Sequence, residues 1–234
     1  MRLKRCLKES SEMTVYEALS FAVKNCSPFL KEIGAVKGDT VKWIYSGRNE
    51  KQLTLVKKIR IDRKPTDTPK AVHELLDNLF YKKFGIKSRS NSVFATSSPA
   101  VAASYGHSFL ILPMGKFTFL YNPLITDLYN RVREIGRKED IILSKNSYPT
   151  DDEMKVLETI LEKEMHKYTN KDLKKGITAR VEIMVQCKEY FAIDSLYESY
   201  FTAYFRTYGI IPPTPENLTQ LFDIEGGKRT LKVL

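Results

Sequence analysis

The sequence has little of the material from which metal sites and disulfide frameworks are built. It holds three cysteines and three histidines in 234 residues, and Cys6, Cys26 and Cys187 are scattered along the chain. A structural zinc site needs about four such ligands at close spacing, and a disulfide framework needs an even and dense set of cysteines. We therefore expect no metal site, and the sparse, odd cysteines indicate a reducing compartment.

Long hydrophobic runs are also missing. No apolar stretch approaches the ~18–20 residues that cross a bilayer. The N-terminal residues Met1–Cys6 are basic but lack the apolar segment of a secretory signal peptide. These absences predict a soluble protein of the cytoplasm.

The common catalytic motifs are absent as well. The sequence contains no GxxxxGK[ST], GxGxxG, HExxH or GxSxG pattern. These are the signatures of P-loop enzymes, dinucleotide-binding Rossmann domains, zinc proteases and serine hydrolases. The sequence thus gives no indication of any of these classes.

What the chain does contain is a core and a strong positive charge. Hydrophobic residues make up 42% and aromatic residues 11%, which is ample for a packed core. With 38 Lys+Arg against 28 Asp+Glu the formal charge is +10, which favours polyanionic partners such as nucleic acid, nucleotides or an acidic protein. The alternative is a lysine-rich surface that only keeps the protein soluble. The local basic clusters, such as Lys57–Lys64, are modest, so charge alone names no partner.

The hydrophobic periodicity predicts helices and short strands without regular βαβ alternation. We expect helices near residues 14–33 (with a kink or break at Pro28), 68–85 (capped by Thr68), 99–105, 151–168 and 195–208, and a short helix in the loose C-terminal tail. We expect strands near residues 41–45, 53–61, 92–96 and 179–185, a hairpin of 109–113 with 117–121, and a strand at 190–193 after a turn at Cys187-Lys188. This order predicts an α+β fold, with a helical segment 1–50 packed on one compact unit 51–234.

Three segments could together carry chemistry. An arginine-bearing strand, Lys57–Arg63, precedes the first central helix, and a strand ending in hydroxyl residues, Ser92–Ser98, follows that helix. A late strand carries Arg180–Val185. In this order the pattern resembles the ADP-ribosyltransferases of the arginine–serine–glutamate class, including their phage- and toxin-type members. The run Ser98–Gly106 also looks like the short segment that follows the second strand in these folds.

The resemblance implies a split antiparallel or mixed sheet and NAD as a substrate. It also implies that the protein is located in the host cytoplasm if the chain is phage-encoded. It implies that Glu182 is the catalytic carboxylate, and that Thr96 and Ser97 hold the ribose and this glutamate. It also implies that Arg60 or Arg63 binds the NAD diphosphate.

The resemblance further implies that Tyr105 stacks on nicotinamide. Cleavage of the nicotinamide–ribose bond passes through an oxocarbenium-like state, which a fixed carboxylate stabilises. Arginine suits the diphosphate because its planar guanidinium is permanently charged.

Each of these residues has a purely structural alternative. Glu182 could lie on the outer face of an edge strand, and Thr96–Pro99 could be a strand end with a helix cap. Arg60 and Arg63 could belong to a solvated basic surface. His73 is more often structural than catalytic, and the aromatic stripe from Tyr197 to Phe205 is more often core packing than a base-stacking surface.

The sequence departs from the family pattern at two points. The aromatic-Arg-Gly of the first strand is missing, because in Trp43–Arg48 the arginine comes after the glycine. Arg48, Arg60, Arg63 and Arg89 therefore all remain candidates for the phosphate ligand.

The second departure is Arg180, which stands two residues before Glu182 where arginine-modifying members have Glu. It favours an anionic acceptor, so the expected function is ADP-ribosylation of a nucleic acid or of a protein associated with nucleic acid. The alternative is a basic nucleic-acid-binding or host-takeover protein, or an acidic-protein binder, that keeps such a fold without the chemistry.

Overall fold

The computed structural model describes residues 13–50, 52–63, 68–144 and 147–222, and it has a mixed α+β architecture, as the sequence predicts. The helices are α1 (Val15–Glu32), α2 (Lys70–Phe84), α3 (Pro99–Ala103), α4 (Leu128–Lys138), α5 (Asp151–Met165), α6 (Leu173–Ala179), the 3-10 helix η1 (Ser195–Tyr197), α7 (Glu198–Tyr208) and α8 (Pro215–Phe222). The strands are β1 (Tyr45–Arg48), β2 (Thr54–Lys58), β3 (Val93–Ala95), β4 (His107–Tyr121) and β5 (Ile183–Asp194).

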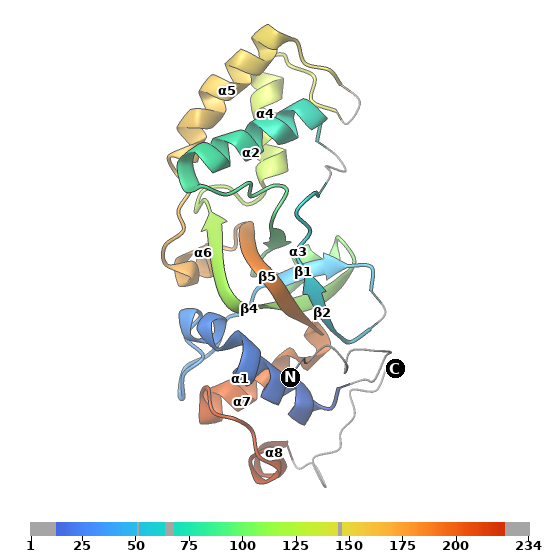
Figure 1. The fold of residues 1–234 in the computed structure, drawn as a ribbon, viewed down its shortest axis with the longest axis vertical. Coiled ribbons are helices and arrows are strands. Elements are labelled where there is room, and N and C mark those ends of the chain that lie inside the picture. The colour runs from blue at the N-terminus through green and yellow to red at the C-terminus, as the bar shows by residue number, and fades with distance from the viewer. Residues whose placement is uncertain (1–12, 51, 64–67, 145–146, 223–234) are drawn as a thin grey trace, which may run out of the picture.

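The molecule is elongated, and its sheet lies between two groups of helices (Figure 1). Helices α2, α4 and α5 form one end, and α1, α7 and α8 form the other. Within the described ranges no helix is both long and apolar enough to cross a membrane.

The sheet is antiparallel and has five strands in the order β1-β4-β5-β2, with β3 also paired to β5. The long strands β4 and β5 pair along most of their length, from Phe109 opposite Asp194 to Tyr121 opposite Ile183. The other edge of β5 pairs first with β3 and then with β2. The first residues of β5 therefore lie in the middle of the sheet, between β3 and the end of β4.

The predicted hairpin of residues 109–113 and 117–121 and the predicted turn at Cys187-Lys188 are both wrong. Met114 pairs with Glu189 and Phe117 with Cys187, so β4 gains one residue on β5 at this point. This is a β-bulge, and Gly115 takes the left-handed backbone conformation with φ +64° that such a bulge needs. The two turn-like sequences are in fact opposite sides of one bulged stretch in a continuous strand pair.

The sheet curls so that its two distant edges meet. Tyr45 of β1 donates its N–H to the carbonyl of Thr96 at 2.7 Å, and the N–H of Thr96 donates to the carbonyl of Tyr45 at 2.9 Å. This bridge places β1 and β3 side by side next to the start of β5, where the candidate site lies.

One hydrophobic core lies between the sheet and the helices α1 and α7. Helix α1 begins with a capping box of Thr14 and Glu17, and Gly34 follows its end with φ +74°. Pro28 does not divide the helix, because the buried face that runs along it outweighs one missing hydrogen bond. The predicted core role of α7 is confirmed for Phe201, Tyr204 and Phe205, all buried.

Segment 1–50 thus contributes more than a helix. Helix α1 packs on β4 in the main core, and β1 is itself a strand of the sheet. The described part of this segment shares one core with the rest of the chain.

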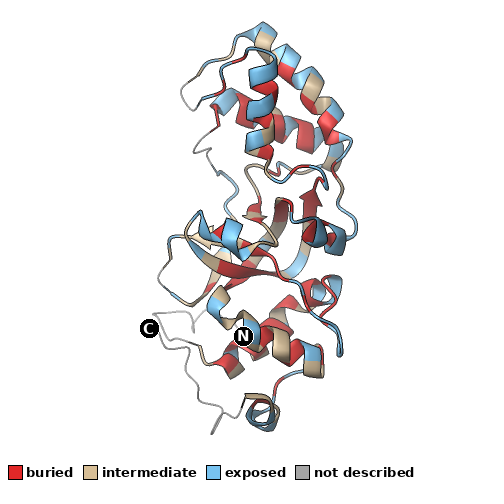
Figure 2. Cartoon of the chain, turned by 180° about the vertical axis from the view of Figure 1, so that it is seen from behind, coloured by how far each residue is buried: buried red, intermediate tan, exposed pale blue. Residues whose placement is uncertain are grey.

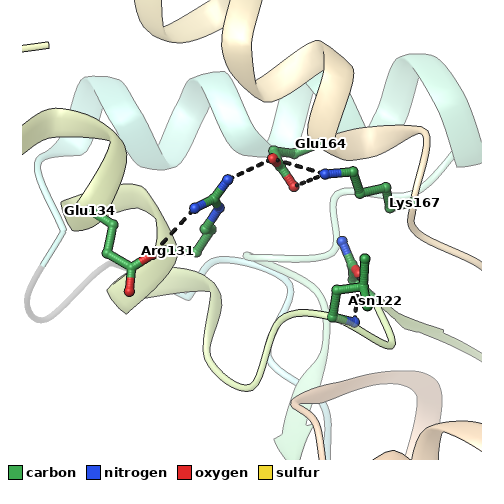
Figure 3. Close-up of polar contacts among 6 residues, drawn as sticks. Asn122, Arg131, Glu134, Glu164 and Lys167 are labelled. Carbon is green, nitrogen blue, oxygen red and sulfur yellow. Dashed lines mark hydrogen bonds and ion pairs between the residues drawn. The ribbon is translucent and has the colours of Figure 1, made fainter. Parts of the chain in front are cut away.

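A second core fills the helical end. Residues of α2, α4 and α5 pack there against Leu120 and Met184 of the sheet. Figure 2 shows that the buried residues of these helices face one another and the exposed ones face outward. Beside this core the nearly buried carboxylate of Glu164 on α5 accepts hydrogen bonds from Arg131 of α4 at 2.8 Å and from Lys167 at 3.2 Å (Figure 3).

Several element boundaries differ from the predictions. The predicted arginine-bearing strand ends as β2 at Lys58, so Arg60 and Arg63 follow this strand and do not lie on it. The strand expected at 41–45 begins only at Tyr45, and Pro69 rather than Thr68 stands at the N-cap of α2, without a side-chain cap. Arg180 is not in a strand: it ends α6 in the left-handed conformation with φ 57°. β5 begins at Ile183, and Glu182 lies immediately before it with its N–H bonded to the carbonyl of Thr126 at 3.1 Å.

Candidate functional site

A cavity of about 230 Å³ opens where β1 and β3 meet, next to the start of β5 and the N-terminus of α4. It is lined by Tyr45, Ser46, Gly47, Arg63, Thr68, His73, Arg89, Phe94, Ala95, Thr96, Val101, Ala102, Tyr105, Thr126, Asp127, Tyr129 and Glu182. The lining gathers two guanidiniums, two carboxylates, an imidazole and three phenols. These groups come from segments far apart in the sequence, and the fold brings them together.

Glu182, which immediately precedes β5, supplies one of the two carboxylates of this cavity. Its side chain is 18% exposed, and its Oε1 lies 3.5 Å from Nη1 of Arg89, which is 12% exposed. Burial raises the pKa of Glu182, and Asp127 raises it further, whereas Arg89, Arg63 and the backbone N–H of Leu128 favour the charged form and lower it. The carboxylate of Glu182 is thus held in place, but the nearby positive groups only partly offset the cost of burying its charge.

Two guanidiniums share the ring of Phe94. The Cζ of Arg63 lies 4.2 Å from the ring centroid and the Cζ of Arg89 lies 4.5 Å from it. Arg63 is exposed as a whole residue, but its guanidinium packs on this ring. Burial of that group and repulsion by Arg89 lower the pKa of Arg63 to about 10, with Glu182 opposing, so Arg63 is charged at neutral pH.

The position of Arg89 is fixed by a buried carboxylate on α2. Asp77, 4% exposed, accepts the N–H of Arg89 at 2.7 Å, the N–H of Ser90 at 3.2 Å, and the hydroxyl of Ser90. His73, one turn earlier on α2, contacts the same hydroxyl through Nε2 at 3.1 Å. The loop that carries Arg89 is therefore tied to the helical end of the molecule.

Helix α4 begins at the cavity wall. Asp127 caps it by accepting the N–H of Asn130 at 2.8 Å, and its other oxygen accepts the hydroxyl of Tyr105 at 3.4 Å. The first N–H of the helix, at Leu128, interacts with Glu182. The positive end of the helix dipole thus faces the buried carboxylate.

Gly47 lets β1 approach α3 closely on the opposite side of the cavity. A Cβ at this position would lie 2.0 Å from the carbonyl oxygen of Ala102 and 2.8 Å from Cβ of Tyr105. Only glycine fits here without moving α3 or the turn after it, which carries Tyr105. The Tyr-Ser-Gly sequence, which departs from the family pattern in lacking its arginine, therefore forms one wall of the cavity.

Four of the six residues predicted from the sequence come together: Arg63, Thr96, Tyr105 and Glu182 line the cavity. The other two lie outside its lining. The side chain of Arg60 is 71% exposed, 3.8 Å from Asp62, and Ser97 has its Oγ buried without a hydrogen-bond partner among the described residues.

The structure also separates the other arginine candidates. Arg89 lines the cavity, whereas Arg48 packs over the ring of Tyr190 with Cζ 4.8 Å from its centroid. The sequence analysis gave no role to Phe94 or Asp127 and interpreted His73 as structural. A helix cap is recognisable at Asp127, but nothing local indicates that its helix begins beside Glu182.

Within the described ranges no group of three or more histidines, cysteines, aspartates or glutamates is placed to hold a metal ion. Comparison of the chain with protein-family models, with curated proteins and with solved structures gives no match. Any functional conclusion therefore rests on the chemistry of the cavity.

Proposed function

We propose that this protein is an NAD-dependent ADP-ribosyltransferase that modifies a nucleic acid or a protein associated with nucleic acid. The observation that carries the proposal is a partly buried carboxylate, Glu182, placed 3.5 Å from Arg89 in one cavity with a second guanidinium. A carboxylate stabilises positive charge on a sugar, and paired guanidiniums bind a diphosphate. Both requirements of NAD chemistry are thus met by side chains that line the same space.

In the proposed reaction the bond between ribose C1′ and the nicotinamide nitrogen breaks, and nicotinamide leaves with the bonding electron pair as a neutral molecule. Glu182 stabilises the positive charge that develops on the ribose. An oxygen or nitrogen of the acceptor forms the new bond to C1′ and loses its proton to solvent. The charge on NAD is discharged in this step, so no oxidant or reductant is needed.

The cavity accommodates part of a dinucleotide. Sites for drug-sized ligands have volumes of roughly 300–1,000 Å³, and this one has about 230 Å³. In the proposal the nicotinamide ribose lies inside, near Glu182, Thr96 and Tyr105. The diphosphate lies at Arg63 and Arg89, and the adenosine extends over the rim.

The test is transfer of label from NAD. We predict that Glu182→Gln lowers transfer or NAD hydrolysis by about 100-fold or more, because the variant cannot stabilise the oxocarbenium charge. The matched control is Glu189→Gln, the same change on β5, the strand that Glu182 immediately precedes, and outside the cavity lining; it should keep full activity. Unchanged transfer by Glu182→Gln, or equal loss in both variants, would contradict the assignment.

A second function is favoured by the formal charge of +10. It is non-enzymatic binding of nucleic acid through phosphate contacts, or takeover of an acidic host protein. This alternative predicts salt-sensitive binding of nucleic acid without any effect of NAD on the stability of the fold.

A further inference from the structure

The hydrogen bonds around His73 determine which of its nitrogens carries the proton. The hydroxyl of Ser90 donates to the carboxylate of Asp77, which only accepts when it is ionised. The Ser90 oxygen then has no proton left for His73, so Nε2 of His73, 3.1 Å away, must be the donor. Nε2 also lies 3.6 Å from Oδ2 of Asp77, which favours the same tautomer.

With Nε2 protonated, Nδ1 of the neutral ring is an acceptor. It is buried and has no hydrogen-bond partner among the described residues, and the side chain is only 7% exposed. His73 forms part of the cavity wall. The wall thus contains a buried acceptor without a protein partner among the described residues, and buried polar groups are normally paired.

Building on the proposed function, we propose that Nδ1 of His73 accepts a hydrogen bond from a neutral donor of the bound dinucleotide. The donor is either a ribose hydroxyl or the amide of nicotinamide. A phosphate does not suit this atom, since an ionised phosphate has no proton to give and is repelled by the lone pair. His73 is accordingly a binding residue that distinguishes hydroxyl or amide groups from phosphate.

The charged groups around the ring keep it neutral. Burial lowers the pKa of His73, Arg89 and Arg63 lower it further, and Asp77 and Glu74 on the same helix oppose them. The ring therefore remains neutral at pH 7, and acid should weaken the ligand contact only when Nδ1 becomes protonated.

The tautomer is tested directly by 15N NMR of the imidazole nitrogens of the full chain without ligand. We expect an unprotonated Nδ1 and a protonated Nε2 at pH 7. When NAD is added, the Nδ1 resonance should move in the direction of a hydrogen-bonded acceptor. A protonated Nδ1 in the free protein would overturn the inference whatever NAD does.

Two substitutions test the two ring nitrogens of His73 separately. In His73→Gln the side-chain amide reaches the position of Nε2 and keeps the contact with Ser90, but the cavity acceptor is lost. In His73→Asn the oxygen lies near the position of Nδ1, so the acceptor is kept and the contact with Ser90 is lost. We expect NAD to bind roughly 10-fold more weakly to His73→Gln, as for one lost hydrogen bond, and within about 3-fold of normal to His73→Asn.

ADP-ribose and nicotinamide identify the donor. If His73→Gln weakens NAD and ADP-ribose alike, the donor is a ribose hydroxyl; if it weakens NAD and nicotinamide, the donor is the amide. Both results support the inference. If NAD binds the wild type and His73→Gln equally, the inference fails and the proposed function stands. If NAD does not bind the wild type at all, the proposed function fails, and the inference about His73, which rests on it, fails too.

Discussion

At the scale of single residues, the two guanidiniums on Phe94 repel each other. Among the described residues, only Glu182 is close enough to Arg89 to form an ion pair. A bound diphosphate would relieve this repulsion. We predict that Arg63→Gln and Arg89→Gln each weaken NAD binding about 10-fold or more, as expected for hydrogen bonds between charged groups.

Arg60→Gln is the matched control for these variants. It removes the same charge from the same segment, but its side chain is 71% exposed and outside the cavity lining. Calorimetric titration with NAD should therefore give nearly the wild-type affinity for it. Equal losses in all three variants would mean that only net charge matters, and would argue against a diphosphate site at Phe94.

Glu182 should also affect stability, in a direction that ordinary surface carboxylates do not. Burial raises its pKa in the folded protein, so the folded state binds its proton more tightly than the unfolded chain does. The resulting stability is fully present below the unfolded pKa of ~4.3 and is lost as the pH rises through the folded pKa. We predict that the melting temperature of Glu182→Gln, relative to wild type, increases between about pH 4 and pH 7. A difference that stays constant across this range would contradict it.

The sequence was sufficient to name candidate site residues. It was less informative about which of them lie together in the folded protein. We could name Glu182, Arg63, Thr96 and Tyr105 because the order of the segments that carry them resembles the ADP-ribosyltransferase pattern. Arg89 could only be named as one of several arginines. Its place depends on Asp77, twelve residues earlier on another element, and no local pattern reveals such a contact.

At the scale of elements, the packing of α4 on α5 depends on the carboxylate of Glu164 (Figure 3). Burial alone would raise the pKa of Glu164, but hydrogen bonds from Arg131 and Lys167 outweigh it and lower the pKa. The stability from this group is therefore present above the unfolded pKa and is lost as the pH falls through the folded pKa. We predict that Arg131→Gln costs about 1–3 kcal/mol of unfolding free energy, because it leaves a nearly buried acceptor poorly satisfied.

Urea unfolding at pH 7 measures this cost, and a double-mutant cycle with Glu164→Gln isolates the pair. The control is Lys155→Gln on α5, whose partner Asp152 is 92% exposed and which should change stability by less than about 0.5 kcal/mol. If Arg131→Gln matched this control, the contact would not contribute to the packing of α4 and α5.

The element predictions succeeded where the cause is local. Helices α1, α2, α5 and α7 follow from apolar periodicity, and the Thr14 capping box adds a local start signal for α1. They failed where the cause is a partner strand. Gly115 and Lys188 look like turn residues, yet β4 and β5 continue through them because each strand supplies the other's hydrogen bonds. Helix α4 was not predicted, although Asp127 caps it and its buried Leu128, Val132 and Ile135 recur at helical spacing.

At the scale of the whole molecule, the cavity lies where the two cores meet. Its walls come from the sheet and from the helical end, through β1 and β3 on one side and α2 and α4 on the other. The order of the predicted helices and strands indicated an α+β fold. The curl of the sheet that brings Tyr45 to Thr96 depends on how the whole sheet closes. Neither the volume of the cavity nor the set of residues that line it could be derived from spacing along the chain.

The charge of +10 gives a prediction that separates the two proposed functions. Both predict that a single-stranded oligonucleotide binds and that its affinity falls steeply with salt, as phosphate neutralisation requires. Only the transferase predicts that NAD, which carries far less charge, also stabilises the fold, by ~2.7 kcal/mol at 100 times its dissociation constant. Thermal unfolding with and without NAD at about 0.15 M salt measures this. Arg63→Gln, if it binds NAD about 10-fold more weakly, should lower the NAD effect to about 1.4 kcal/mol while leaving most of the oligonucleotide affinity. Oligonucleotide binding without any NAD stabilisation would favour the non-enzymatic protein, because the cavity would then serve no dinucleotide.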